Sequence, residues 1–79
     1  MDWRAYIEQD PKILSGKPCL RGTRISVESI IEDMGDGASV EEILEAYPFL
    51  RAEQVRAALA FAAASLAAER VIFAEPTGS

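Results

Sequence analysis

The clearest pattern along the chain is a helical spacing of apolar residues that begins at Val27. Apolar side chains recur there every three or four residues, which places them on one face of a helix; they are Val27, Ile30, Ile31 and Met34. Ser26 precedes the run and is a residue type that caps helix N-termini. The Gly-Asp-Gly segment at 35–37 offers a glycine for the left-handed residue that often closes a helix. The pattern predicts a first helix between these signals.

Two further helices are predicted downstream. The same spacing recurs at Val40, Ile43, Leu44 and Tyr47. Ser39 and Glu42 stand in the order of a capping box, in which each side chain accepts a hydrogen bond from the other residue's backbone amide. Pro48 ends this second helix, because proline lacks an amide hydrogen. A third, longer helix is expected from residue 51 or 52 to about residue 69.

The third helix is apolar on nearly every side, which is typical of a helix that is buried on more than one side. One stripe is expected to face the core of its own chain, and it consists of Val55, Leu59, Ala62 and Leu66. The opposite face is expected to pack against a second chain in a homodimer, and it consists of Ala57, Ala60, Ala64 and Ala67. The alternative is that these alanines face solvent, since alanine is the best helix former.

The segment before the first helix has a different character. Short apolar pieces at residues 13–14, 19–20 and 25 are separated by Gly16 and Gly22, which read as turn residues between very short strands. This pattern predicts a small β-hairpin or β-arc, whereas residues 2–14 remain ambiguous. The fold class expected is mainly α, a three-helix, helix-turn-helix-like domain with a small N-terminal β-hairpin. We expect a single domain over 1–79, with an N-terminal β element (1–25), a three-helix core (26–69) and a C-terminal tail (70–79).

Charge divides the chain sharply. The net charge is −5 and the isoelectric point is about 4.6, yet residues 11–27 carry four bases and no acid, while residues 28–50 carry seven acids and no base. The basic segment is therefore the anion-facing surface that the sequence offers, with Lys17, Arg21, Thr23 and Arg24 as candidate contacts for a partner or DNA. Arg21 and Arg24 could present guanidinium groups to carboxylates or phosphates. The alternative is that the glycines only form turns and the arginines are solvated.

The sequence gives little support to catalysis. It has no histidine, no nucleophile elbow, no P-loop and no paired cysteines, so we expect no catalytic residues, no cofactor and no metal site. Cys19 lies between Pro18 and Leu20 and is expected to be a small core residue. The single cysteine and the lack of a signal-peptide pattern or long apolar run favour a cytoplasmic location.

The second helix, the Tyr-Pro-Phe-Leu turn and the third helix have the order of a helix-turn-helix. Reading bases in the major groove requires donors and acceptors on the recognition helix. The third helix offers Glu53 and Gln54 and then mostly alanine, and the acidic residues of the second helix would repel phosphates. The layout is that of a DNA reader, but its surface chemistry is not.

Taken together, these motifs resemble a bacterial and archaeal family called domain of unknown function 433. The resemblance covers about residues 10 to 64 and rests on Asp-Pro at 10–11, Gly-Thr-Arg-Ile at 22–25, Glu-Glu-Ile-Leu at 41–44, Tyr-Pro at 47–48 and the alanine-rich third helix. Ser26 stands where proline is frequent in the family. Arg51 stands where threonine is usual, which removes a good N-cap from the third helix.

The resemblance implies a helix-turn-helix-type domain that acts as a VapB-like antitoxin, the inhibitor of a PIN-like ribonuclease encoded beside it, with binding of its own operator DNA as a further implication. Arg21 and Arg24 could then face the nuclease's acidic pocket. A rival contact is the apolar run Val71, Ile72 and Phe73, which could add a strand or fill a groove. Two alternatives remain open, a DNA-binding repressor without a toxin and a small dimerisation module.

Overall fold

The computed structural model describes residues 1–69, and its first two α-helices begin at the caps that the sequence predicts. Helix α1 spans Val27–Gly35, and the Ser26 hydroxyl oxygen accepts a hydrogen bond of 3.0 Å from the Ser29 amide. Helix α2 spans Val40–Ala46 and has the predicted capping box. Its two hydrogen bonds, 3.1 Å from the Glu42 amide to Ser39 Oγ and 2.8 Å from the Ser39 amide to Glu42 Oε1, satisfy amides that have no partner within the helix.

Helix α3 spans Ala52–Glu69, as the sequence predicts. Arg51 cannot cap this helix with its side chain in the way that serine or threonine would. Instead the Arg51 amide donates a hydrogen bond of 2.7 Å to Gln54 Oε1, which is one half of a capping box. Gln54 therefore provides an acceptor for the Arg51 amide, although residue 51 offers no side-chain acceptor to the first amides of the helix.

The β element is built only in part from the residues that the sequence suggested: the piece at 19–20 is a strand, but its partner lies earlier in the chain. Strand β1 is Ile7–Glu8 and strand β2 is Cys19–Leu20, paired antiparallel with Ile7 opposite Leu20. Short 3-10 helices at Trp3–Ala5 and Leu14–Gly16, labelled η1 and η2, precede and follow β1. The expectation of a strand at residues 13–14 was wrong, because Leu14, Ser15 and Gly16 all have positive φ angles, which a strand does not allow.

The hairpin is joined directly to α1. Cys19 forms an isolated antiparallel bridge with Ser26, the residue that caps α1. In addition, the Val27 amide donates a hydrogen bond of 3.0 Å to the Pro18 carbonyl. The first turn of α1 is therefore held to the strand that precedes it.

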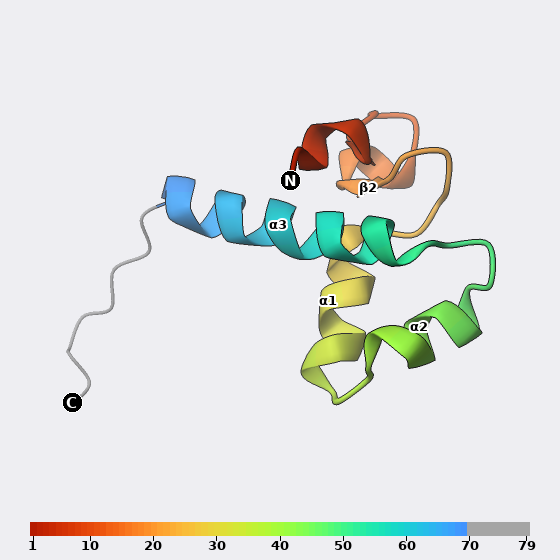
Figure 1. Ribbon diagram of the computed structural model, residues 1–79. Helices are drawn as coiled ribbons and strands as arrows, with labels where there is room; N and C mark the ends of the chain where they lie inside the picture. The colour runs from red at the N-terminus through yellow and green to blue at the C-terminus, as the bar shows by residue number, and fades with distance from the viewer. Residues whose placement is uncertain (70–79) are drawn as a thin grey trace, which may run out of the picture.

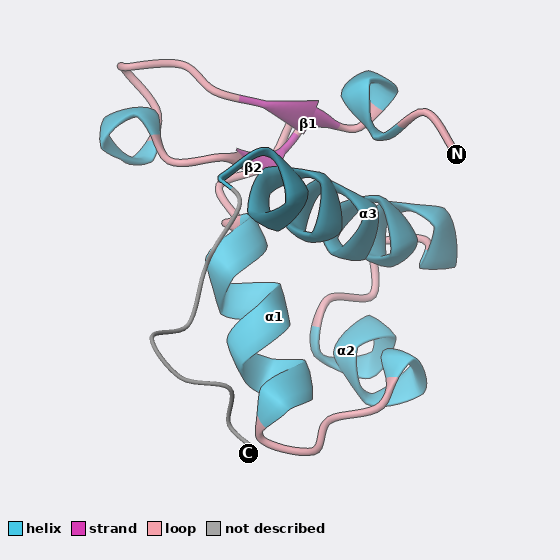
Figure 2. Cartoon of the chain, turned by 90° about the vertical axis from the view of Figure 1, so that its left-hand side faces the viewer, coloured by secondary structure: helices cyan, strands magenta, loops and turns pink. Residues whose placement is uncertain are grey.

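Helix α3 lies between the two halves of the molecule. In Figure 1 the N-terminal hairpin lies on one side of α3 and helices α1 and α2 lie on the other, and Figure 2 shows the same order from the side. Helix α3 contacts α1, α2, β1 and η1. The core between these elements is formed by buried apolar side chains, namely Ile7, Leu20, Val27, Ile30, Ile43, Leu50, Val55, Ala57 and Ala58. The predicted fold class, three helices with a small N-terminal antiparallel hairpin, is confirmed.

The orientation of α3 about its own axis differs from the expected one. Val55 is fully buried, but Leu59 and Leu66 are 40% and 60% exposed, so the expectation that this stripe faces the core was wrong for both leucines. The side of α3 that is buried carries Ala57 and Ala58. These small side chains allow the backbones of neighbouring elements to approach closely, and close packing in the core determines which face turns inward.

Candidate functional site: the basic hairpin turn

The turn that follows β2 is a closed hydrogen-bonded loop over residues 20–25. The Leu20 amide donates to the Ile25 carbonyl at 2.9 Å, and the Thr23 amide donates to the Leu20 carbonyl at 3.0 Å. The Thr23 hydroxyl donates to the Leu20 carbonyl at 2.8 Å and accepts from the Ile25 amide at 3.0 Å. Gly22 supplies the positive φ of +80° that this turn requires. Thr23, a candidate contact residue, is thus engaged in shaping the turn.

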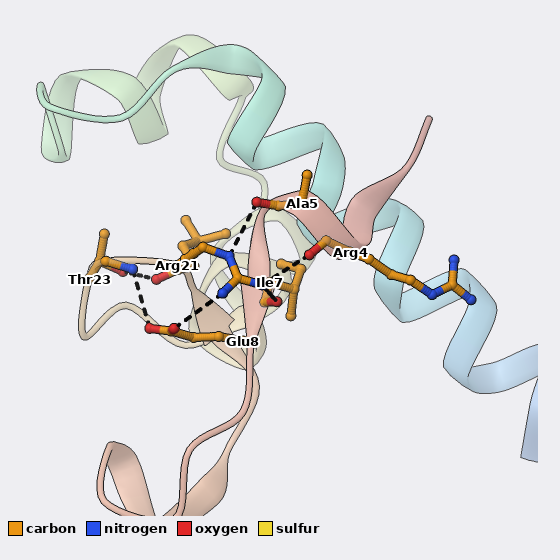
Figure 3. A network of polar contacts seen from close by, with 8 residues as sticks. Arg4, Ala5, Ile7, Glu8, Arg21 and Thr23 are labelled. Carbon is orange, nitrogen blue, oxygen red and sulfur yellow. Dashed lines mark hydrogen bonds and ion pairs between the residues drawn. The ribbon is translucent and has the colours of Figure 1, made fainter.

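Arg21 is held by its own chain. Its guanidinium donates hydrogen bonds to the carbonyls of Arg4 at 3.1 Å, Ala5 at 3.3 Å and Ile7 at 3.0 Å. Figure 3 shows this side chain directed at the backbone between η1 and β1. The guanidinium therefore fixes the N-terminal segment against β2, since one planar group satisfies three carbonyl oxygens.

Glu8 completes this network from β1. Its Oε1 lies 3.6 Å from Arg21 Nη1, and its Oε2 accepts a hydrogen bond of 3.3 Å from the Gly22 amide. The carboxylate offsets the charge of Arg21 and fixes the start of the turn. Of the two arginines that the sequence proposed as a paired cationic surface, Arg21 is thus committed to intramolecular contacts.

Arg24 has the opposite character. It is exposed, and the hydrogen bonds and ion pairs formed among residues 1–69 include none from its side chain. Lys17 Nζ lies 3.2 Å from Glu28 Oε1, but the two side chains are 60% and 61% exposed. Such an exposed pair contributes little and separates easily. The cation that the turn at residues 20–25 offers to a partner is therefore Arg24, with Lys17 nearby in sequence.

Cys19 is fully buried, as the sequence predicts. Burial raises the pKa of its thiol above the usual value, and the carboxylates of Glu8 and Asp10 add to this shift. A buried thiol with a raised pKa is a poor nucleophile. Cys19 is a structural residue of the hairpin.

The exposed acidic face of α1 carries Glu28, Glu32 and Asp33, residue types that can ligate metal ions. Within residues 1–69, no three potential ligands from histidine, cysteine, aspartate or glutamate gather closely enough to hold an ion. In the same part of the chain, no buried side-chain nitrogen or oxygen lacks a hydrogen-bond partner.

No helix of residues 1–69 is long and apolar enough to cross a membrane.

The alanine face predicted as a dimer interface does not form one open surface. Ala57 is fully buried in the core of its own chain and Ala60 is partly buried, whereas Ala64 and Ala67 are exposed. Ala57 is thus unavailable to a second chain, which corrects that part of the prediction. The tail residues Val71, Ile72 and Phe73 lie outside the described residues.

The large apolar side chains that the structure exposes were missed as contact residues. Leu59 and Leu66 on α3 are exposed, and Phe49 in the turn before α3 is 67% exposed. The spacing of the two leucines was visible in the sequence. Periodicity shows that residues share a face, but it does not tell whether that face meets the core or a partner.

The described residues form a small, mainly helical domain in which a two-stranded hairpin precedes three helices, the last two in helix-turn-helix order. The chain belongs to the family described as Protein of unknown function (DUF433), whose model matches residues 7–62. The match begins at β1 and includes the turn at residues 20–25.

A curated relative adds a second comparison. The chain is 41% identical over 78 residues to the Uncharacterized protein y4eO of Sinorhizobium fredii (strain NBRC 101917 / NGR234). This similarity covers 96% of the present chain but 35% of the relative, so the chain spans about a third of that protein's length. No solved structure matches the chain significantly.

Proposed function

We propose that this protein is the antitoxin of a type II toxin-antitoxin pair, which binds and inhibits a PIN-like ribonuclease without catalysing a reaction itself. The observation that carries the proposal is Arg24, an exposed guanidinium on a closed turn of an acidic protein. PIN-like nucleases work with clustered carboxylates and Mg²⁺, so a guanidinium that enters this acidic pocket gains charge-assisted hydrogen bonds.

The rigidity of the turn supports this role. Four hydrogen bonds close residues 20–25, and Arg21 and Glu8 brace the turn from the side of β1. A side chain presented from a preformed turn loses less conformational freedom on binding than one presented from a mobile loop. Arg24 is the contact residue in this proposal, and Arg21 and Thr23 position it.

Operator DNA is the second candidate partner, because α2, the turn at 47–51 and α3 have the order of a helix-turn-helix. Opposing it, Glu41, Glu42 and Glu45 are exposed on α2, where they would face the phosphates. A gel shift with the upstream DNA over a salt series tests this alternative. Binding that weakens steeply with salt would support phosphate contacts, and no binding at low salt would exclude a repressor.

The proposal is tested by searching the genes next to this one for a PIN-like nuclease, purifying that nuclease together with the chain, and measuring RNA cleavage at increasing chain concentration. Arg24→Glu should weaken inhibition by about 100-fold, which corresponds to roughly 2.7 kcal/mol of lost binding. The matched control is Arg51→Glu, since Arg51 is also exposed but lies in the turn before α3.

The outcomes distinguish the candidate contacts. Inhibition that survives Arg24→Glu but disappears when the chain ends at residue 69 would assign the contact to the tail residues 71–73. If neither change affects inhibition, both contacts are wrong. A wild-type chain that neither binds the nuclease nor shifts DNA would leave the small dimerisation module as the function.

A further inference from the structure

An apolar groove lies between α1 and the second half of α3. It has a volume of about 450 Å³ and is lined by Pro18, Val27, Glu28, Ile31, Glu32, Phe61, Ala62, Ser65 and Leu66. Its lining is apolar apart from Ser65 and the two glutamates of α1. A groove of this kind accepts the apolar side chains of a helix whose polar residues meet the rim.

The exposed face of α3 next to this groove has the matching chemistry. Leu59, Ala63 and Leu66 follow one another at intervals of four and three residues, and all three are exposed. This spacing places them along one seam of the helix, the arrangement by which two helices interlock. Leu66 belongs to both the seam and the groove, so the two form one continuous apolar surface.

The charges at the two ends of this surface are complementary. Arg56 is exposed three residues before Leu59 and continues the seam, and no ion pair within the described chain includes it. At the groove, Glu32 is also exposed and absent from those ion pairs, and Glu28 has only the exposed partner Lys17. Arg56 at one end of the surface could therefore form an ion pair with Glu28 or Glu32 at the other end of a second, identical surface.

We propose that the occupant of this groove is a second copy of the same chain, in a two-fold dimer with antiparallel α3 helices that cross near Ala63. A two-fold dimer requires a surface that is complementary to itself. This surface meets that requirement, because it carries a seam beside a groove, with a base at one end and acids at the other. Leu59 of each copy lies beside Leu66 of the other and enters the groove. Arg56 of each copy then lies at the acidic rim formed by Glu28 and Glu32 of the other.

This dimer differs from the one predicted from the alanine pattern. Ala57 is buried within its own chain and takes no part, and the contact moves by part of a turn about the axis of α3 to the exposed leucines. The dimer does not depend on the proposed antitoxin function, because neither Arg24 nor the hairpin turn belongs to the interface.

Sedimentation equilibrium of the full-length chain over a concentration series tests the proposal. The wild-type chain should be a dimer, and Leu59→Glu or Leu66→Glu should raise the dissociation constant by at least ~100-fold, as expected for central apolar contacts. The control is Phe49→Glu, which introduces the same charge at an exposed apolar residue away from the groove and should leave the dimer intact. Circular dichroism of each variant verifies that the monomer remains folded.

A charge exchange tests the register. Arg56→Glu and Glu32→Arg should each weaken the dimer by about 5-fold, and the double variant should restore it, which a purely structural role of either residue would not produce. A monomeric wild-type chain, or a dimer that only Phe49→Glu disrupts, would overturn the proposal. A dimer lost in the leucine variants but not restored by the charge exchange would overturn the antiparallel register. A monomer whose Leu59→Glu variant no longer binds the nuclease would assign the groove to that partner instead.

Discussion

Replacing Arg21 with alanine should destabilise the fold, whereas the same change at Arg24 should not. The two arginines lie on the same turn, but the guanidinium of Arg21 donates to the carbonyls of Arg4, Ala5 and Ile7. Arg24 makes no such contact within residues 1–69. The pair therefore separates a residue that holds the fold together from one that is free to bind a partner.

The magnitude follows from the exposure of each contact. The bond to the Ile7 carbonyl is partly buried and should contribute about 1 kcal/mol, because a hydrogen bond from a charged donor loses part of its strength to water. The two exposed carbonyl bonds and the partly exposed ion pair with Glu8 add roughly 1 kcal/mol together. Arg21→Ala should thus lower the free energy of unfolding by about 2 kcal/mol, or the melting temperature by about 8–16 °C for a domain of this size.

Urea denaturation followed by circular dichroism measures both variants. Arg24→Ala should remain within about 0.5 kcal/mol of wild type, as is usual for exposed residues without contacts. Arg21→Lys should be intermediate, because an ammonium cannot satisfy three carbonyls in the planar arrangement of a guanidinium. Equal stabilities of Arg21→Ala and Arg24→Ala would refute the assignment of Arg21 as the brace of the hairpin.

Three further predictions concern stability. Gly22→Ala should destabilise the fold by about 1 kcal/mol, because Gly22 has a φ of +80°, which alanine adopts at a cost even though an added Cβ meets no atom within 4 Å. As its counterpart, Gly35→Ala should stabilise the fold by about 0.5 kcal/mol, because Gly35 is a helical residue with equally open surroundings. Ser39→Ala should cost about 1 kcal/mol in urea denaturation, because α2 loses its capping hydrogen bond. Since burial raises the pKa of the Cys19 thiol, unfolding should become easier as the pH rises above the ordinary thiol pKa, where the unfolded chain releases a proton that the folded chain retains.

Each of these predictions has its own control. The opposite signs at Gly22 and Gly35 exclude a general effect of adding a methyl group. A Glu41→Ala variant tests whether the loss at Ser39 reflects only a change at the start of α2. The fall in stability at alkaline pH should be smaller in Cys19→Ala by the contribution of this one thiol, and an unchanged pH profile would contradict the role of Cys19.

The helices could be predicted from the sequence because their signals are local. Ser26, Ser39 and Glu42 act within one turn of helix, so their spacing alone determines the caps that the structure shows. The strand Ile7–Glu8 could not be predicted in this way. It is two residues long, and its partner β2 lies more than ten residues further along the chain.

The remaining errors have a common physical cause. Three of the partners of Arg21 are backbone carbonyls, and every residue has a carbonyl, so the sequence does not indicate them. Helix α3 is apolar on nearly every side, so its periodicity carries little information about which side turns inward. The packing of η1, β1 and α1 against α3 decides this, it buries the side that carries Ala57 and Ala58, and only the tertiary structure reveals it.

Trp3 lies edge-on against Phe61, with ring centroids 4.9 Å apart and an interplanar angle of 76°. Phe61 also lines the groove between α1 and α3, and Trp3 is the one tryptophan in the chain. Indole emission depends on its immediate surroundings, so a ligand that moves the Phe61 ring should alter the fluorescence of the protein. The chain thus carries a built-in optical reporter next to its apolar groove, which allows binding there to be titrated without a label.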